Sequence, residues 1–311
     1  MHLRAPDVPF LDAEVVLDTS VVTTPFAFLG IPYGPPYRPE DMTDAAGAAD
    51  AVRTCVRRME YASAAHHHDF DLDGPLFHDG HVTVTDCGNV VGDDTDPGAI
   101  WDRAIDVVRP LVERGVTPLV MGGLDAIPPI VAEPFAAAAE PLHVLHVDAH
   151  LDFRDEVGGE RRGYSSPIRR IREMRHVGEI VQVGLRAVGS GRPSDVRDAI
   201  GSGNVLVKAD EVHAFGVASV VDRLQRIGGR WMVTIDCDGL DPSIAPGVGW
   251  PEPGGLTFPQ ISTIVRALAR RSSIAALVVT EYQPDRDIAG ITALTVARLF
   301  LNTIGLQRRS G

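Results

Sequence analysis

Short apolar segments recur along the chain and restrict the folds open to it. Eight are rich in Val, Ile and Leu: 27–33, 81–88, 117–123, 142–150, 180–186, 204–212, 231–238 and 274–282. Stretches with helical spacing lie between several of them, at 99–115, 218–229 and 259–271. Strands that are apolar throughout and alternate with helices indicate a parallel sheet covered on both faces. The pattern predicts a three-layer α/β/α sandwich around an eight-stranded, mainly parallel sheet.

Length and composition favour one large folded unit. The chain has 311 residues, of which 44% are hydrophobic, which is typical of globular rather than disordered proteins. Its sequence contains no internal repeat, low-complexity tract or Gly/Ser linker. We therefore expect a single domain over residues 1–311.

Charge and cysteine content bear on partners and compartment. The net charge is −13, and nucleic-acid binding needs a concentrated positive surface, so we expect a small cationic substrate and no nucleic-acid partner. Cys55, Cys87 and Cys237 match neither a disulfide framework nor a cysteine zinc site. The N-terminus lacks a signal peptide, and no run of about 18 apolar residues could span a bilayer. We expect a cytoplasmic protein without a membrane partner.

Acidic residues follow two of the apolar segments. HVDAHLDF (146–153) contains Asp148, His150 and Asp152, and TIDCDGLDP (234–242) contains Asp236 and Asp238. Extended geometry would place side chains two residues apart on one side, and functional groups collect at the carboxyl ends of parallel strands. The alternative is that each Asp separately caps a turn or helix, but two clusters on two strands favour a shared site.

Several carboxylates in one place repel one another unless cations neutralise them. Carboxylate-rich ligation suits a hard divalent ion such as Mn²⁺ better than zinc. Two such ions about 3.5–4 Å apart could hold a hydroxide and deliver it to an electrophilic carbon. The acid clusters therefore predict a two-metal hydrolase.

These segments resemble the ureohydrolase family of arginases and agmatinases, which hydrolyse a guanidino group to urea and an amine over two manganese ions. The most specific match is TIDCDGLDPSIAPGVGWPEPGGLT, followed by HVDAHLDF. Weaker matches are FLGIPY (28–33), DCGNV (86–90), MGG (121–123), VGLR (183–186) and EYQP (281–284). The run SSPIRR after HVDAHLDF resembles the agmatinase branch.

The resemblance implies roles for individual residues. Asp148 and Asp236 would bridge the two ions, Asp152 would bind the first, and His150 and Asp238 would complete the second. Glu281 would accept the substrate guanidinium, the alternative being a solvent-facing acid. The family also implies an eight-stranded parallel sheet and a homo-oligomer, either a trimer or a hexamer.

Two departures affect the predicted chemistry. Where the family usually reads GGDHS, with the His as a ligand of the first ion, this chain reads GGLDA, and whether Asp125 binds metal in its place is open. Tyr164 stands where the family often carries a proton-shuttling His. Because tyrosine ordinarily has a pKa near 10, it shuttles protons poorly. The leaving amine would then be protonated by water or by a metal-linked carboxylic acid.

Two further residues bear on the substrate. Trp250 could narrow the pocket or contact a guanidinium through its ring, and the alternative is plain packing. Arg154 could bind a carboxylate, favouring a guanidino acid over agmatine; the alternative is an ion pair with Asp155 or Glu156. The tract HHHDFDLD (66–73) is expected to be a solvated loop, because adjacent histidines do not converge on one point.

Three functions remain open. The favoured one is an agmatinase-like ureohydrolase that cleaves agmatine or a related guanidino compound. The second is a non-catalytic binding or assembly subunit, suggested by the changes at Asp125 and Tyr164. The third is a hydrolase of an amidine, formimino or amide group on the same metal scaffold.

Overall fold

A nine-stranded sheet forms the centre of the computed structural model, which describes residues 2–32, 34, 37, 46–58, 67–77, 82–92 and 97–307. The strand order is β1-β5-β2-β6-β11-β10-β7-β8-β9. The strands are β1 (Leu3–Arg4), β2 (Phe26–Ile31), β5 (Val84–Val90), β6 (Thr117–Gly122), β7 (Leu142–Val147), β8 (Val177–Leu185), β9 (Val205–Lys208), β10 (Arg230–Asp236) and β11 (Ser273–Thr280). Among the described residues, every pairing in this sheet is parallel apart from that of β1 with β5.

The predicted fold class is confirmed, with two corrections. Each of the eight apolar segments contains a strand, but β1 adds a ninth, antiparallel one that is too short to stand out in the sequence. The segment 204–212 is only partly a strand, because β9 ends at Lys208 and a helix begins at Ala209.

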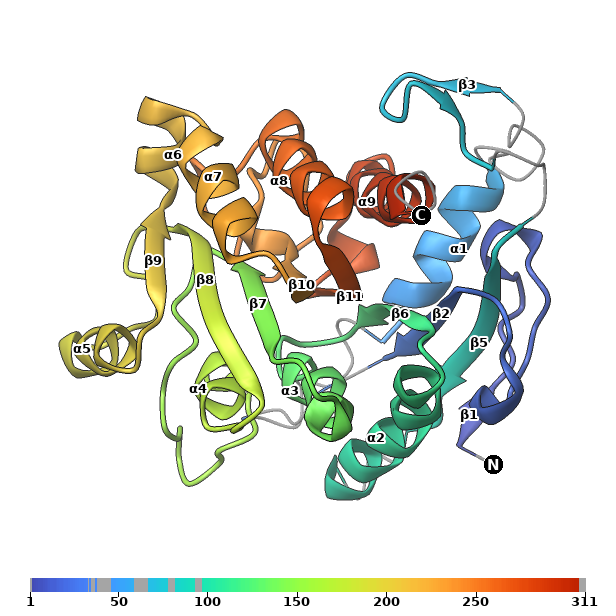
Figure 1. Ribbon diagram of the computed structural model, residues 1–311, viewed down its shortest axis with the longest axis horizontal. Helices are drawn as coiled ribbons and strands as arrows, with labels where there is room; N and C mark the ends of the chain where they lie inside the picture. Colours follow the sequence, from blue (N-terminus) through green and yellow to red (C-terminus); the bar gives the residue numbers. More distant parts are fainter. Residues whose placement is uncertain are drawn as a thin grey trace.

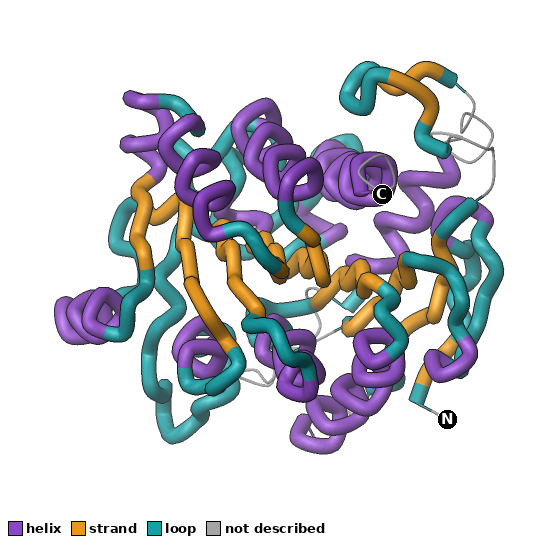
Figure 2. The backbone as a smooth tube through the Cα atoms, in the orientation of Figure 1, coloured by secondary structure: helices purple, strands orange, loops and turns teal. Residues whose placement is uncertain are grey.

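Helices cover both faces of the sheet (Figures 1 and 2). One layer contains α1 (Ala48–Arg58), α6 (Ala209–Phe215), α7 (Ala218–Ile227), α8 (Phe258–Arg271) and α9 (Ile291–Gln307). The other contains α2 (Pro97–Glu113), α3 (Pro128–Ala132), α4 (Pro167–Arg172) and α5 (Pro193–Gly201). Short 3-10 helices are η1 (Phe10–Asp12), η2 (Thr19–Val21), η5 (Glu133–Ala137), η6 (Cys237–Gly239) and η7 (Pro284–Arg286). The three helical stretches predicted from spacing correspond to α2, α7 and α8.

The core consists of two hydrophobic clusters, one on each face of the sheet. In β7, Val144 packs into one cluster, whereas Leu145 and Val147 pack into the other. Because successive strand residues point to opposite faces, a strand covered on both sides must be apolar throughout. This burial explains the continuous apolar runs of the sequence.

Local sequence signals define helix ends. At the start of α8, Gln260 Oε1 accepts hydrogen bonds from both the backbone N and the Oγ1 of Thr257. This pairing satisfies a free donor at the first turn. At the end of α7, Gly228 adopts a φ of 64°, a conformation that glycine reaches without steric cost.

The tract 66–73 is not simply a loop. His66 lies outside the described residues, and β3 (His68–Asp69) pairs with β4 (Gly74–Pro75) in a small hairpin. The backbone pairing of these residues was not evident from their polar side chains. Within the described ranges, no helix is long and apolar enough to cross a membrane.

Candidate metal centre

The acidic segments meet at one edge of the sheet. Strands β6, β11, β10, β7 and β8 are consecutive neighbours and run parallel, so their carboxyl ends lie side by side. The segments after these strands line a cavity of about 660 Å³, within the range of small-molecule sites. The strand order therefore brings together residues far apart in the sequence.

The first cluster of candidate ligands contains Asp125, His146 and Asp148, all fully or almost fully buried. His146 Nε2 lies 3.1 Å from Asp148 Oδ2 and 3.6 Å from Asp125 Oδ2. None of these three atoms has a hydrogen-bond partner outside the cluster. Buried polar atoms that reach only one another are suited to a shared cation, so this convergence fits a bound metal ion.

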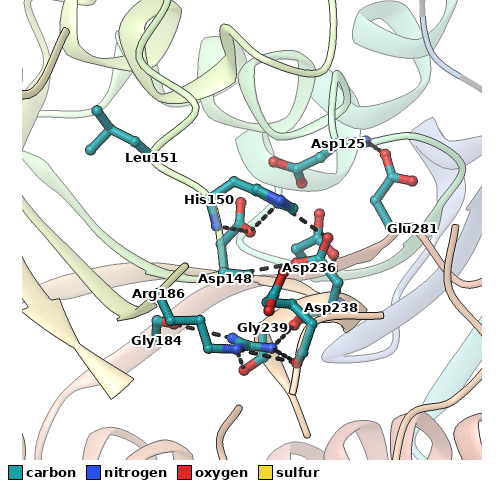
Figure 3. Close-up of polar contacts among 12 residues, drawn as sticks. Asp125, Asp148, His150, Leu151, Gly184, Arg186, Asp236, Asp238, Gly239 and Glu281 are labelled. Atoms are coloured by element: carbon teal, nitrogen blue, oxygen red, sulfur yellow. Dashed lines mark hydrogen bonds and ion pairs between the residues drawn. The ribbon is translucent and has the colours of Figure 1, made fainter. Parts of the chain in front are cut away.

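The second cluster shares Asp148 and adds His150 and Asp238. His150 Nδ1 lies 3.3 Å from Asp148 Oδ1 and 3.2 Å from Asp238 Oδ2. Figure 3 shows the His150 ring reaching towards both acids, while the neighbouring Leu151 points away. Two overlapping clusters with a common carboxylate can hold two ions.

Turns, rather than extended geometry, bring these groups together. β7 ends at Val147, and Asp148 Oδ1 accepts a hydrogen bond from the backbone N of His150 at 2.7 Å. Asp236 Oδ1 likewise accepts from the backbone N of Asp238 at 2.8 Å. The extended geometry expected for these motifs is therefore wrong. Asp148 and Asp236 therefore each cap a turn, but each uses only Oδ1 for this bond.

Asp152 and Asp236 also line the cavity. They lie outside the two sets of converging ligand atoms, and their roles as ligands stay predictions. Asp152 has a φ of 48°, in a left-handed region that non-glycine residues seldom adopt. Such local strain is often found at functional sites.

Position 125 is linked to the end of β11. Thr280 Oγ1 donates to Asp125 Oδ1 at 2.5 Å, and the backbone N of Asp125 donates to Glu281 Oε1 at 2.8 Å. Glu281 is not the solvent-facing acid of the alternative interpretation, because its side chain lines the cavity beside the cluster (Figure 3). Its φ of 60° directs the chain sharply away from the strand.

Close packing of the backbone holds the two acidic turns together. A Cβ at Gly239 would lie 2.6 Å from the backbone N of Asp148, and one at Gly184 would lie 2.9 Å from the carbonyl oxygen of Asp148. Arg186 donates to the carbonyl oxygens of Asp238 at 2.6 Å and Gly184 at 3.1 Å. Both glycines and the arginine therefore position the acids without using their carboxylates.

The buried acids resist ionising together. Burial raises the pKa of Asp152 and of Asp236 well above the ordinary range, and the charges of neighbouring acids raise both further. Burial also raises the pKa of Glu281 to about 8 and that of Asp238 to about 6. Bound cations would favour the ionised forms.

The histidines show the complementary effect. Burial alone would lower the pKa of each imidazole, but the adjacent carboxylates outweigh it. Asp125 and Asp148 raise the pKa of His146 to about 10, and Asp148 and Asp238 raise that of His150 to about 12. In the absence of another cation, these rings carry the positive charge of the site.

The remaining predicted residues are placed differently. Tyr164 and Trp250 line the cavity, and the Trp250 side chain is 79% exposed, which does not fit plain core packing. Arg154 is not among the lining residues; its Nε donates to the carbonyl oxygen of Ser190 at 3.1 Å. No ion pair of Arg154 with Asp155 or Glu156 occurs among the described residues; Asp155 pairs with Arg161 and Arg170 instead.

Three residues of this site were not predicted from the sequence: His146, Arg186 and Gln283. His146 lies within an apolar strand, but it stands two positions before Asp148 and therefore on the same face. Arg186 and Gln283 lie in the quoted segments VGLR and EYQP. These two segments match the family only weakly, and the match alone gives no role to their polar side chains.

Comparison with known proteins agrees with this fold and site. The arginase family matches residues 24–305. The chain is 34% identical to the mitochondrial arginase of Medicago truncatula over 225 residues, which are 70% of this chain and 62% of that protein. It is 31% identical to the mitochondrial agmatinase of Gallus gallus over 206 residues, which are 65% of this chain and 60% of that protein. The chain thus spans less than two thirds of these relatives.

The fold also has close structural neighbours. The structure of proclavaminate amidino hydrolase from Streptomyces clavuligerus matches with a TM-score of 0.84 at 24% identity, covering 99% of both chains. At this identity the likeness concerns the fold, and it agrees with the layered parallel sheet. Because the family match extends over almost the whole sequence, the chain belongs to the arginase family.

Proposed function

We propose that this protein is a metal-dependent hydrolase that cleaves a guanidino compound, such as agmatine or a relative of it, to urea and an amine. The observation that carries the proposal is the convergence of three buried atoms that have no hydrogen-bond partner outside their own cluster, Asp125 Oδ2, His146 Nε2 and Asp148 Oδ2. Family membership supports the reaction class.

We assign the first ion to Asp125, His146 and Asp148, and the second to Asp148, His150 and Asp238. Asp152 and Asp236 would complete the two shells. In this assignment His146 supplies the imidazole that position 125 lacks. Gln182 Nε2 lies 3.3 Å from His146 Nδ1 and fixes the position of the ring.

Two bound divalent ions would activate water for attack on the guanidino carbon, and this oxygen-rich ligand set suits Mn²⁺. Glu281 would orient the substrate. Its Oε1 is occupied by the backbone N of Asp125, which leaves Oε2 to accept a guanidinium N–H. The substrate cation would in turn lower the raised pKa of Glu281 and keep it ionised.

Metal counting combined with product analysis tests the proposal. Protein purified in Mn²⁺ should hold about two ions per chain by elemental analysis and release urea from at least one guanidino compound. His146→Ala should reduce the count to about one, whereas His143→Ala, which removes an imidazole from the same strand outside the cluster, should leave it unchanged. One ion or none in the wild type, without urea release, would instead favour a non-catalytic subunit. Turnover of an amidine without urea would favour the third function.

A further inference from the structure

The residues that line the cavity differ in charge and in burial. The acids Asp125, Asp152, Asp236 and Asp238 are buried, whereas Arg286, in the segment 281–286, is exposed. Glu281, Gln283 and Arg286 all line the cavity. One stretch of chain thus offers an acid, an amide and a guanidinium in succession.

Gln283 has an unused acceptor on this stretch of chain. Its side chain is 5% exposed, and its Oε1 has no hydrogen-bond partner. A buried amide oxygen without a hydrogen-bond partner lowers the stability of the protein. A donor from a bound molecule would give Gln283 Oε1 the hydrogen bond that it lacks. A guanidinium held by Glu281 can supply that donor, which places the cationic head of the substrate beside Glu281 and Gln283.

Arg286 is an exposed cation that is not neutralised within the described chain. No ion pair or hydrogen bond of its side chain occurs among the described residues. The neighbouring Asp287 is already used, because its carboxylate accepts from the hydroxyl of Tyr282 at 3.0 Å and from the backbone N of Thr292 at 3.0 Å. The guanidinium of Arg286 is therefore available to an anion in the cavity.

The other arginines near the cavity are occupied. Arg186 donates to backbone carbonyl oxygens, including that of Glu252 at 2.5 Å, and Arg154 donates to that of Ser190. Glu252 itself lines the cavity and could accept an ammonium group. The cavity could therefore bind either of two substrate tails. One is a simple carboxylate, and the other is an amino-acid group that carries both a carboxylate and an ammonium.

We infer that the substrate is a guanidino acid, whose guanidinium binds Glu281 and Gln283 and whose carboxylate binds Arg286. The inference rests on the proposed function for the position of the guanidinium. Guanidinium–carboxylate pairs can form two parallel hydrogen bonds, which gives a physical basis for preferring an anionic tail. Agmatine lacks this carboxylate, so its ammonium tail would leave Arg286 unpaired even where Glu252 accepts the ammonium.

The test compares kcat/KM for urea release from 4-guanidinobutyrate, L-arginine and agmatine. At least one of the two carboxylates should exceed agmatine by about 10-fold or more. Arg286→Gln should bring this ratio close to one, mainly through KM, and Arg286→Glu should invert it. Arg286→Lys should retain part of the preference, and Arg270→Gln, on the exposed side of α8, should retain all of it.

Different failures have different meanings. A wild-type preference for agmatine, or an unchanged ratio in Arg286→Glu, would overturn the tail assignment while leaving ureohydrolase activity intact. Absence of urea from all three compounds would count against the proposed function. Calorimetric binding of 4-guanidinobutyrate and agmatine to Mn²⁺-loaded wild type and Arg286→Gln would then decide the tail preference separately: equal affinities would overturn it, and a loss confined to the carboxylate would support it.

Discussion

Two buried groups of charges in this protein are neutralised in different ways. Arg53 and Asp86 are both fully buried and form a bidentate pair, with two N–O distances of 2.8 Å. The remaining donors of Arg53 contact Asp50, Asn89 and the carbonyl oxygen of Gly88. This network joins α1 to β5 and leaves Arg53 fully satisfied.

The acid cluster at the carboxyl ends of β6, β7, β10 and β11 has the opposite property. Asp125, Asp148 and His146 have buried atoms without a hydrogen-bond partner outside the cluster, and burial raises the pKa of Asp236 and Asp152. The comparison indicates that a buried charge with complete internal pairing supports the fold, whereas an incomplete set is suited to an external cation.

The largest effect on stability is expected for Arg53→Ala. Removing Arg53 leaves Asp86 buried without its counterion, and breaking a buried pair in this way costs about 3–5 kcal/mol. Urea denaturation measures the free energy of unfolding. Arg4→Ala is the matched control: Arg4 pairs with Asp50 at the surface, and its loss should cost less than about 1 kcal/mol. Similar losses for both variants would contradict the distinction.

Asp236→Asn should show the reverse pattern. Asn keeps the acceptor for the backbone N of Asp238 and removes an acid whose ionised form is disfavoured by burial and by neighbouring acids, so the metal-free protein should be as stable as the wild type or more stable. If Asp236 bridges the ions, the loss of several kcal/mol of transition-state stabilisation should reduce kcat by about 100-fold or more. Denaturation in EDTA and urea-release assays measure the two effects. A strongly destabilised metal-free variant would indicate that the acid is structural.

The pH dependence of stability should depend on metal. The folded-state pKa of Glu281 is raised from 4.5 to about 8, so the folded metal-free protein binds more protons than the unfolded chain between these values. Its free energy of unfolding should therefore fall as pH rises through this window, and the raised pKa of His146 acts in the same direction above about pH 6.5. Thermal melting in EDTA should show a decrease of at least about 3 °C between about pH 5 and pH 8.

Mn²⁺ should stabilise the protein increasingly over the same pH range, because ligands bind metal in their deprotonated forms. Glu281→Gln removes one of the titrating groups and should flatten the decrease seen in EDTA. If melting temperatures with and without Mn²⁺ changed in parallel across the range, the acid cluster would not be the metal site.

The smallest effect on stability is expected for Trp250→Ala. Because the Trp250 side chain is 79% exposed, its removal should change the free energy of unfolding by less than about 0.5 kcal/mol. If the ring contacts the bound guanidino compound, KM should rise by about 2- to 5-fold. A large stability loss with no change in KM would support packing instead.

Much of the fold could be predicted because buried parallel strands leave a strong local pattern. The segments 118–121 and 274–279 are apolar throughout, and the structure contains β6 and β11 there. The two-residue β1 and the helical part of 204–212 left no comparable pattern, since a single turn or a short edge strand buries few side chains. The acid motifs indicated a shared site. The turns at Asp148 and Asp236 could not be predicted, because they begin where β7 and β10 end and the sequence does not mark those ends.

The sequence by itself determined the layered α/β architecture, the family, and the meeting of acids at the carboxyl edge of a parallel sheet. Only the tertiary structure decided that Asp125 would meet Thr280, 155 positions away, that His146 would face both Asp125 and Asp148, and that Arg286 rather than Arg154 would line the cavity. Periodicity records which face of an element is buried. Contacts between distant elements depend on strand order and on close packing, which no local pattern specifies.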